Sequence, residues 1–109
     1  MVQRYLTKPY LIDGYKFDLR LYVLINGISP LRMYMYRDGL ARFATVPYKL
    51  PAPSNMNNLC MHLTNYAINK DQDAFEQNAG NDSQGSKRSY LAVLQILRRL
   101  EGHDAVDKL

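Results

Sequence analysis

The segment KFDLRLYVL, residues 16–24, constrains the fold more than any other stretch of the chain. Apolar and polar side chains alternate along it, which is the period-two pattern of a strand with two different faces. The apolar face carries Phe17, Leu19, Leu21 and Val23. The opposite face carries Lys16, Asp18, Arg20 and Tyr22. A strand this apolar is expected well inside a sheet, so the row of charges on its other face needs an explanation.

Three further segments of the first half have the composition of strands. We therefore expect strands over residues 2–6, 16–25, 31–37 and 40–46. Asn26-Gly27 and Asp38-Gly39 are dipeptides typical of tight hairpin turns. Consecutive strands joined by such turns pair with their neighbours, so the first half predicts an antiparallel β-meander.

The second half of the chain has a different character. Residues 71–86, DQDAFEQNAGNDSQGS, are polar and contain glycine, so we expect a mobile surface loop there. Residues 89–99 follow with leucine and isoleucine at helical spacing. Ser86 or Ser89 would cap the start of this helix, and Gly102 would end it. The helix would cover one face of the sheet, so the predicted fold class is α+β, an antiparallel β-meander with a covering helix.

Composition and charge narrow the classes of function. The chain is 47% hydrophobic and 22% charged, which is ordinary for a soluble globular protein. No apolar run approaches the roughly 20 residues that cross a bilayer, and no secretory signal opens the chain, so no membrane partner is expected. Cys60 is the only cysteine, which fits a reducing compartment. The net charge is +4 and residues 1–49 alone carry +5, which favours an anionic partner.

The charged strand face has two interpretations. Lys16, Asp18 and Arg20 could form surface ion pairs, which are common and contribute about 0–1 kcal/mol each. Alternatively, Lys16 and Arg20 point the same way roughly 13 Å apart, which suits an extended polyanionic ligand such as a nucleotide. Arg42, on the strand after an adjacent hairpin, could face the same cleft. Other hydrogen-bonding residues of little use to a core are Gln3, Arg4, His62, Thr64 and Asn65.

The HLTN cluster is weak evidence by itself. A lone histidine such as His62 is more often a structural residue than a catalyst. Thr64 and Asn65 could form only a local turn or a helix cap. These residues gain weight only in combination with the charged strand.

Taken together, four segments resemble the tubulin tyrosine ligase-like family. They are VQRYLTKPYLIDGYKFDLRLYVL, PLRMYMYRDGLARFATVPY, MHLTNYAINK and GSKRS, in the family's order and over most of the chain. The second and third look more like the polyglutamylase branch than the glycylase branch or tubulin tyrosine ligase itself. The resemblance implies that residues 1–109 are the central part of a catalytic domain with an ATP-grasp-like fold.

The resemblance also implies an activity. Such enzymes activate a carboxylate with ATP through an acyl phosphate and then form an amide bond. Here the expected product is a glutamate chain on a glutamate side chain, usually in an acidic C-terminal tail of tubulin. The implied cofactors are ATP and Mg²⁺, and the implied partners are glutamate and tubulin or microtubules. The implied location is the cytoplasm and cytoskeleton, with the cilium or basal body as narrower options.

Site residues are carried over from the family's motifs position by position. The predicted catalytic residues are Arg20, Arg42 and His62. The predicted nucleotide-binding residues are Gln3, Arg4, Tyr5, Leu6, Lys16, Asp18, Thr64 and Asn65. Residues 3–6 match the hinge strand along the adenine, and Arg20 and Arg42 match arginines around the reacting carboxylate and acyl phosphate. No metal ligand is predicted in this chain, because the family's Asp strand and Glu-x-Asn motif are expected beyond Leu109.

The chain departs from the family in its length. The tripeptide EQN at residues 76–78 has the letters of the metal motif, but it lies in a polar stretch without an apolar strand, so we interpret it as a coincidence. We expect the isolated 109 residues to lack ligase activity and to expose apolar surface. Two alternatives stay open: a non-catalytic remnant that binds tubulin, and a small basic module that binds nucleic acid through its tyrosines.

Overall fold

A computed structural model describes residues 2–72 and 85–102. The predicted surface loop at residues 71–86 lies largely outside the described residues, and the EQN tripeptide lies entirely outside them. The described elements are β1 (Leu11–Ile12), β2 (Tyr15–Arg20), β3 (Val23–Ile28), β4 (Leu31–Met35), β5 (Leu40–Phe43), α1 (Leu59–His62), α2 (Tyr66–Asn69), β6 (Lys87–Ser89) and α3 (Tyr90–Glu101). The fold is a mixed α+β arrangement with antiparallel pairing, as predicted.

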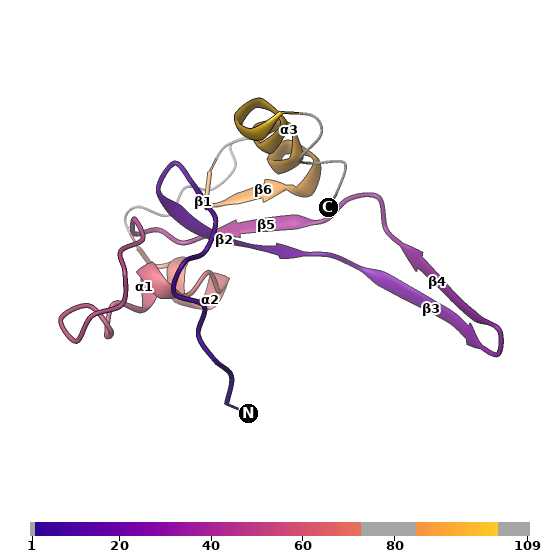
Figure 1. Ribbon diagram of the computed structural model, residues 1–109, viewed down its shortest axis with the longest axis horizontal. Coiled ribbons are helices and arrows are strands. Elements are labelled where there is room, and N and C mark those ends of the chain that lie inside the picture. Colours follow the sequence, from indigo (N-terminus) through magenta and orange to yellow (C-terminus); the bar gives the residue numbers. More distant parts are fainter. Residues whose placement is uncertain (1, 73–84, 103–109) are drawn as a thin grey trace.

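The strands form two sheets rather than one meander. A four-stranded antiparallel sheet has the order β1-β2-β5-β6, and β3 pairs with β4 in a separate two-stranded sheet. In Figure 1, α3 lies on one side of the larger sheet and the short helices α1 and α2 lie on the other. The simple meander is therefore wrong, because β5 pairs with β2 instead of with β4, the strand that precedes it in the chain.

A single long hairpin explains this topology. Its outgoing arm runs through β2 and β3, and its return arm runs through β4 and β5 (Figure 1). The pair Arg20↔Leu40 is followed by the pair Val23↔Met35, so two residues intervene on the outgoing arm and four on the return arm. The extra return-arm residues interrupt the pairing and split the expected strand over residues 16–25 into β2 and β3.

The hairpin turn lies where neither predicted turn dipeptide is found. β3 and β4 are joined by Ser29 and Pro30, which are linked by a cis peptide bond. Asn26-Gly27 lies inside β3, where the register shifts between Ile25 and Ile28 and Gly27 has φ 92°. The dipeptide therefore marks a bulge, and glycine suits a bulge as well as it suits a hairpin turn. Asp38-Gly39 belongs to the interruption on the return arm.

Gly39 is required by a close approach of the two arms. A Cβ added at this position would lie 2.5 Å from the carbonyl oxygen of Arg20, closer than real Cβ atoms come to a backbone. The backbone N–H of Gly39 donates to Oδ1 of Asp38, and the same oxygen accepts the N–H of Leu91 at the start of α3. The predicted turn dipeptide thus joins the return arm to the helix.

The first residues do not form the predicted strand. Residues 2–6 are extended coil, and neither sheet includes them. A strand needs a neighbouring strand for its backbone hydrogen bonds, and none of the described strands runs beside this segment.

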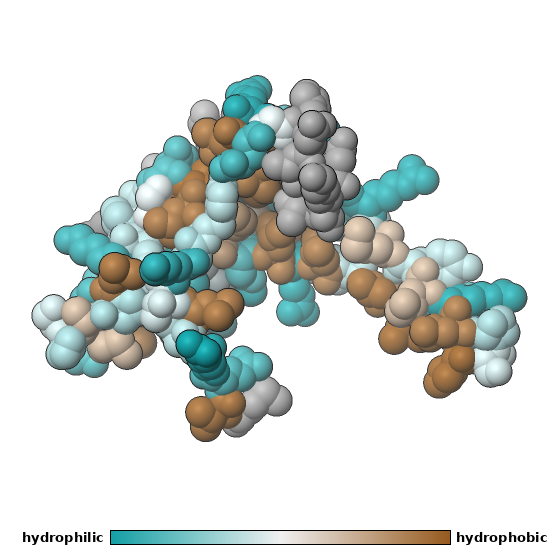
Figure 2. All heavy atoms as spheres, in the orientation of Figure 1, coloured by the Kyte–Doolittle hydropathy of each residue, from teal (hydrophilic) through white to brown (hydrophobic). Residues whose placement is uncertain are grey.

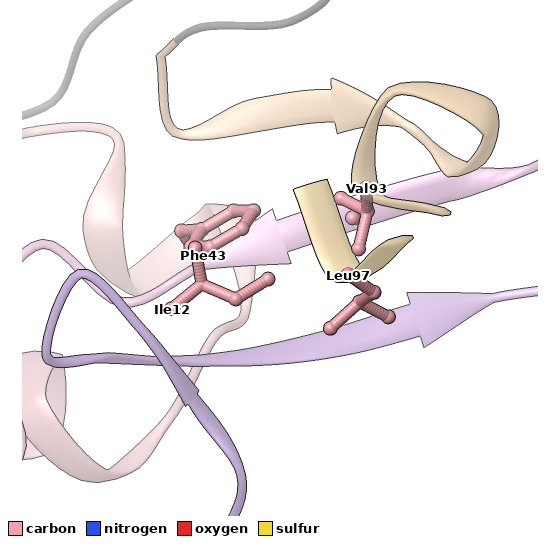
Figure 3. Packing of buried hydrophobic residues seen from close by; sticks show 5 residues of the cluster. Ile12, Phe43, Val93 and Leu97 are labelled. Carbon is pink, nitrogen blue, oxygen red and sulfur yellow. The ribbon is translucent and has the colours of Figure 1, made fainter. Parts of the chain in front are cut away.

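The core lies between α3 and the four-stranded sheet. Ile12, Phe43, Val93 and Leu97 converge there, as Figure 3 shows. Phe17 stacks on Phe43 with ring centroids 5.3 Å apart. The α3 helix begins where predicted, because the Ser89 side chain accepts the N–H of Ala92, and it ends at Gly102, which has φ 84°. The covering helix and both of its caps are confirmed.

The outer part of the hairpin has no such cover. Leu24, Ile25, Met33 and Met35 in β3 and β4 are 60–64% exposed. Figure 2 shows these apolar residues gathered on the arm that projects away from the helices. The expectation of exposed apolar surface is confirmed. None of the described helices has the length and apolar character needed to cross a membrane.

Leu97 and Leu100 provide a matched test of the core within one helix. Leu97 is 8% exposed and belongs to the core, whereas Leu100 is 60% exposed. Leu97→Ala is expected to lower the free energy of unfolding by about 2–5 kcal/mol, because it leaves a cavity under α3. Leu100→Ala should change it by less than about 0.5 kcal/mol. Urea denaturation followed by circular dichroism measures both, and equal losses would contradict this packing.

Candidate functional site

The side of the four-stranded sheet turned away from α3 carries most of its ionisable residues. Phe17 and Phe43 point toward the helix, so their neighbours in sequence point to the opposite side. We call that side the charged face. Its sheet residues are Lys16, Asp18 and Arg20 from β2, Arg42 from β5 and Lys87 from β6. Four cations against one carboxylate give this face an excess of three positive charges.

Asp18 and Arg42 form an ion pair at the centre of the charged face. They are cross-strand partners. Nε of Arg42 lies 3.0 and 3.2 Å from the two carboxylate oxygens of Asp18, and Nη2 lies 2.5 Å from one of them. The hydrogen bond to Asp18 raises the pKa of the Arg42 guanidinium against the opposing effect of burial. One predicted interpretation, a surface ion pair, thus holds for Asp18, although its partner is Arg42 rather than Lys16 or Arg20.

Lys87, in β6, lies beside Arg42 on the charged face. It is the cross-strand partner of Arg42, and its Nζ lies 3.7 Å from the ring centroid of Tyr66. That contact is a cation–π interaction, which holds the ammonium group over the first residue of α2. Thr64, Arg42 and Lys87 line one shallow hollow beside it. The structure therefore places Thr64 near Arg42, two of the predicted site residues.

Lys16 is held by a second group of residues. Its Nζ donates to the hydroxyl of Tyr5 at 3.1 Å and to the backbone oxygen of His62 at 2.9 Å. The Tyr5 hydroxyl lies 3.0 Å from Nδ1 of His62, and Nε2 of His62 lies 3.1 Å from the carbonyl oxygen of Asn55. His62 is 6% exposed, and the ring of Tyr48 packs edge-on against it. The imidazole is therefore enclosed, with both nitrogens engaged.

Tyr48 ties the first residues to this group. Its hydroxyl donates to the backbone oxygen of Thr7 at 2.8 Å. Burial raises the pKa of Tyr48, and the neighbouring Tyr5 adds to the rise. The phenol therefore stays neutral and keeps its donor at physiological pH.

The HLTN segment is fastened to the sheet by Asn69. This side chain is 1% exposed. Its Nδ2 donates to the backbone oxygens of Leu63 and Asn65, and its Oδ1 accepts from the N–H and the hydroxyl of Thr45. All four hydrogen-bonding positions of the amide are thus satisfied. Asn69 therefore holds the loop that carries Thr64 and Asn65 against Thr45, just after the end of β5.

The other predicted residues are not brought into these contacts. Arg20 has an exposed side chain near the ring of Tyr22 and forms no ion pair within the described part of the chain. Gln3, Arg4 and Leu6 are exposed, and of residues 3–6 only Tyr5 reaches the charged face. The side chain of Asn65 makes no capping hydrogen bond to α2, although its backbone oxygen accepts from Asn69.

Sequence reasoning missed four residues of this site: Asn55, Tyr48, Asn69 and Lys87. Asn69 and Lys87 stand inside the quoted segments MHLTNYAINK and GSKRS, so a search for polar residues in those segments would have included them. Asn55 carried no signal, because its contact with His62 is made by a backbone oxygen. Tyr48 closes the second quoted segment, PLRMYMYRDGLARFATVPY, but its partners are distant in sequence.

Two further observations bear on what this site can hold. Within residues 2–72 and 85–102, no three histidine, cysteine or acidic side chains lie together as a metal site would require. A cavity of about 320 Å³ lies elsewhere, lined by Tyr15, Phe43 and Arg88 among others, and none of the predicted site residues borders it. The charged face therefore suits an anion, whereas the described residues do not form a magnesium site.

The charged face is a basic sheet surface on which Lys16 and Arg42 are held by hydrogen bonds. Comparison with known proteins gives the family. A model described as the tubulin-tyrosine ligase family matches residues 1–109, and the chain belongs to that family. The predicted resemblance is thus confirmed.

Named relatives agree with the predicted branch. The chain is 56% identical over 111 residues to a probable beta-tubulin polyglutamylase of Tetrahymena thermophila, covering 100% of this chain and 9% of that protein. It is 54% identical to mouse tubulin polyglutamylase TTLL13, covering 94% of the chain and 12% of that protein. Human tubulin polyglutamylase TTLL6 is 47% identical, covering 85% of the chain and 10% of that protein. The chain thus spans about a tenth of the length of these relatives.

The Asp18–Arg42 pair predicts a measurable coupling. Both side chains are about one-third exposed, so we expect a double-mutant cycle of Asp18→Asn and Arg42→Gln to give a coupling of about 1 kcal/mol in the free energy of unfolding. Urea denaturation of the four proteins measures it. A control cycle of Glu101→Gln with Arg42→Gln should be additive, because these residues share no partner. Equal coupling in both cycles would contradict the pair.

Asn69 predicts a larger loss from one amide. Asn69→Leu leaves the Thr45 N–H and the carbonyl oxygens of Leu63 and Asn65 without that partner. We expect the free energy of unfolding to fall by at least about 2 kcal/mol. Asn57→Leu, at an exposed position, is the control and should stay within about 0.5 kcal/mol. Thermal and urea denaturation would contradict the assignment if Asn69→Leu were as mild as the control.

Proposed function

We propose that this segment forms the basic floor of the ligand cleft of an ATP-dependent ligase, within an ATP-grasp-like domain, that joins glutamate to glutamate side chains of tubulin. The observation that carries the proposal is the excess of cations on the charged face, in a chain whose relatives are named tubulin polyglutamylases. A surface of this kind attracts phosphates and carboxylates together. Both groups are present when a nucleotide activates an amino acid.

Arg20 and Arg42 are proposed to hold the reacting carboxylate and the groups that gather negative charge beside it. ATP, when bound, supplies the phosphoryl group that activates the carboxylate. A guanidinium group matches a carboxylate with two parallel N–H donors, which an ammonium group cannot do. Arg42 is already oriented by Asp18, so its remaining edge is directed before any ligand arrives. Such preorganised donors stabilise developing negative charge most effectively.

Lys16, Thr64 and Asn65 are proposed to face the nucleotide, with residues 3–6 along its adenine. Lys16 retains one N–H that no described residue accepts, because Tyr5 and the His62 backbone oxygen take the other two. Asp18 is proposed to act there mainly through Arg42, since its carboxylate already accepts the guanidinium hydrogen bonds. The ammonium of Lys87 adds charge at the far edge of the same face.

Magnesium is part of the proposed chemistry, but its ligands are not found among the residues described. Asp18 is the single carboxylate that the strands place on the charged face, and it is bound to Arg42. Proposed partners are glutamate and the acidic C-terminal tails of tubulin, and the proposed location is the cytoplasm and its microtubules, including those of cilia.

Arg20 and Arg99 offer a matched test of the proposed function. In the full-length protein that contains this segment, labelled glutamate should enter tubulin in the presence of Mg-ATP. Arg20→Lys keeps the charge but loses the planar fork, so we expect incorporation to fall at least tenfold. Arg99→Lys, at an exposed position on α3, should leave incorporation unchanged.

Three results would contradict the proposal. Equal activity of the two variants would remove Arg20 from the site. Microtubule co-sedimentation of a wild-type protein that incorporates no glutamate would favour a non-catalytic tubulin-binding role. Salt-dependent binding of single-stranded nucleic acid, with no nucleotide-dependent ligation, would favour a small basic module that binds nucleic acid.

A further inference from the structure

Lys16 is held in place more firmly than a lysine on an open sheet face usually is. Its ammonium group donates to the Tyr5 hydroxyl and to the His62 backbone oxygen, and it also lies 4.4 Å from the centroid of the Tyr5 ring. These partners come from two segments that are far apart in the sequence. A lysine side chain normally samples many rotamers, so this convergence limits it to one position.

The hydrogen bonds around Tyr5 and His62 have one consistent direction. The carbonyl oxygen of Asn55 can only accept, so Nε2 of His62 carries the proton that the bond between them requires. The ammonium group of Lys16 can only donate, so the Tyr5 oxygen accepts from it. The Tyr5 hydroxyl then donates its own proton to Nδ1 of His62. Each member fixes the next, from Asn55 through His62 and Tyr5 to Lys16.

This chain of bonds gives His62 a different role from the predicted catalytic one. Its ring nitrogens are both occupied, the ring is buried, and Tyr48 packs against it. The ring is thus not available to accept a proton from a substrate. Its backbone oxygen and its Nδ1 both act on Lys16, the first directly and the second through Tyr5.

We propose that Tyr5 and His62 are positioning residues that fix the ammonium group of Lys16 before ligand binding, so that its remaining N–H meets a phosphate of the nucleotide. This inference rests on the proposed function, because it needs a nucleotide at the charged face. Holding the cation in advance removes the rotamer loss that would otherwise oppose binding. Tyr5 thereby links the segment of residues 3–6 to the phosphate-binding lysine.

A double-mutant cycle tests whether Tyr5 acts through Lys16. Binding of a non-hydrolysable ATP analogue to the full-length protein is measured by calorimetry. Tyr5→Phe keeps the ring and removes the hydroxyl, and we expect its dissociation constant to rise roughly five- to tenfold. Lys16→Met should weaken binding further. In the Lys16→Met background, Tyr5→Phe should have no additional effect, because the cation that Tyr5 positions is gone.

The control and the contrary outcomes separate this inference from the proposed function. Tyr10→Phe removes a hydroxyl that bonds Glu101 instead, so it should leave the dissociation constant unchanged. If Tyr5→Phe weakens binding equally with and without Lys16, or not at all, the positioning role is overturned while the proposed function stands. If the wild-type protein binds no nucleotide, both are overturned.

Discussion

The pairing of β2 with β5 is the interaction on which the rest of the structure depends. Its register sets Phe17 opposite Phe43 and Asp18 opposite Arg42. Because side chains alternate across a sheet, the same register places the aromatic pair under α3 and the ion pair on the charged face. A slip of one residue would turn the charges into the core and the phenylalanines into solvent. The hydrophobic core and the candidate site are therefore two consequences of one strand pairing.

The alternating segment at residues 16–24 was sufficient to predict both faces of β2. Leucine and isoleucine spacing predicted α3, and the serine and glycine that flank it predicted its caps. The turns could not be predicted in this way. Asn-Gly and Asp-Gly suit hairpin turns, but a bulge uses the same positive φ of glycine, and a close backbone approach needs its missing Cβ. Gly27 and Gly39 meet such needs, so local preference alone did not distinguish them from turn residues.

The candidate site was predictable in its composition but not in its connections. Lys16, Asp18, Arg42, His62 and Thr64 all lie on or beside the charged face, as the family motifs imply. The partners of each were not readable, because Asp18 binds a residue 24 positions away and Lys16 binds the backbone of one 46 positions away. Sequence identifies which functional groups are present, whereas strand register and loop closure decide which of them bind to each other.

The cations of the charged face differ in whether a carboxylate of the sheet lies beside them. Asp18 neutralises Arg42, but Lys16, Arg20 and Lys87 have no carboxylate of the sheet beside them. Cations on neighbouring strands repel each other, and tyrosine rings under Lys16 and Lys87 offset only part of that cost. A bound anion would offset the remainder and stabilise the folded segment by mass action. Among residues 2–72 and 85–102 these three cations have no carboxylate partner, so an anion bound to the charged face would supply the opposite charge.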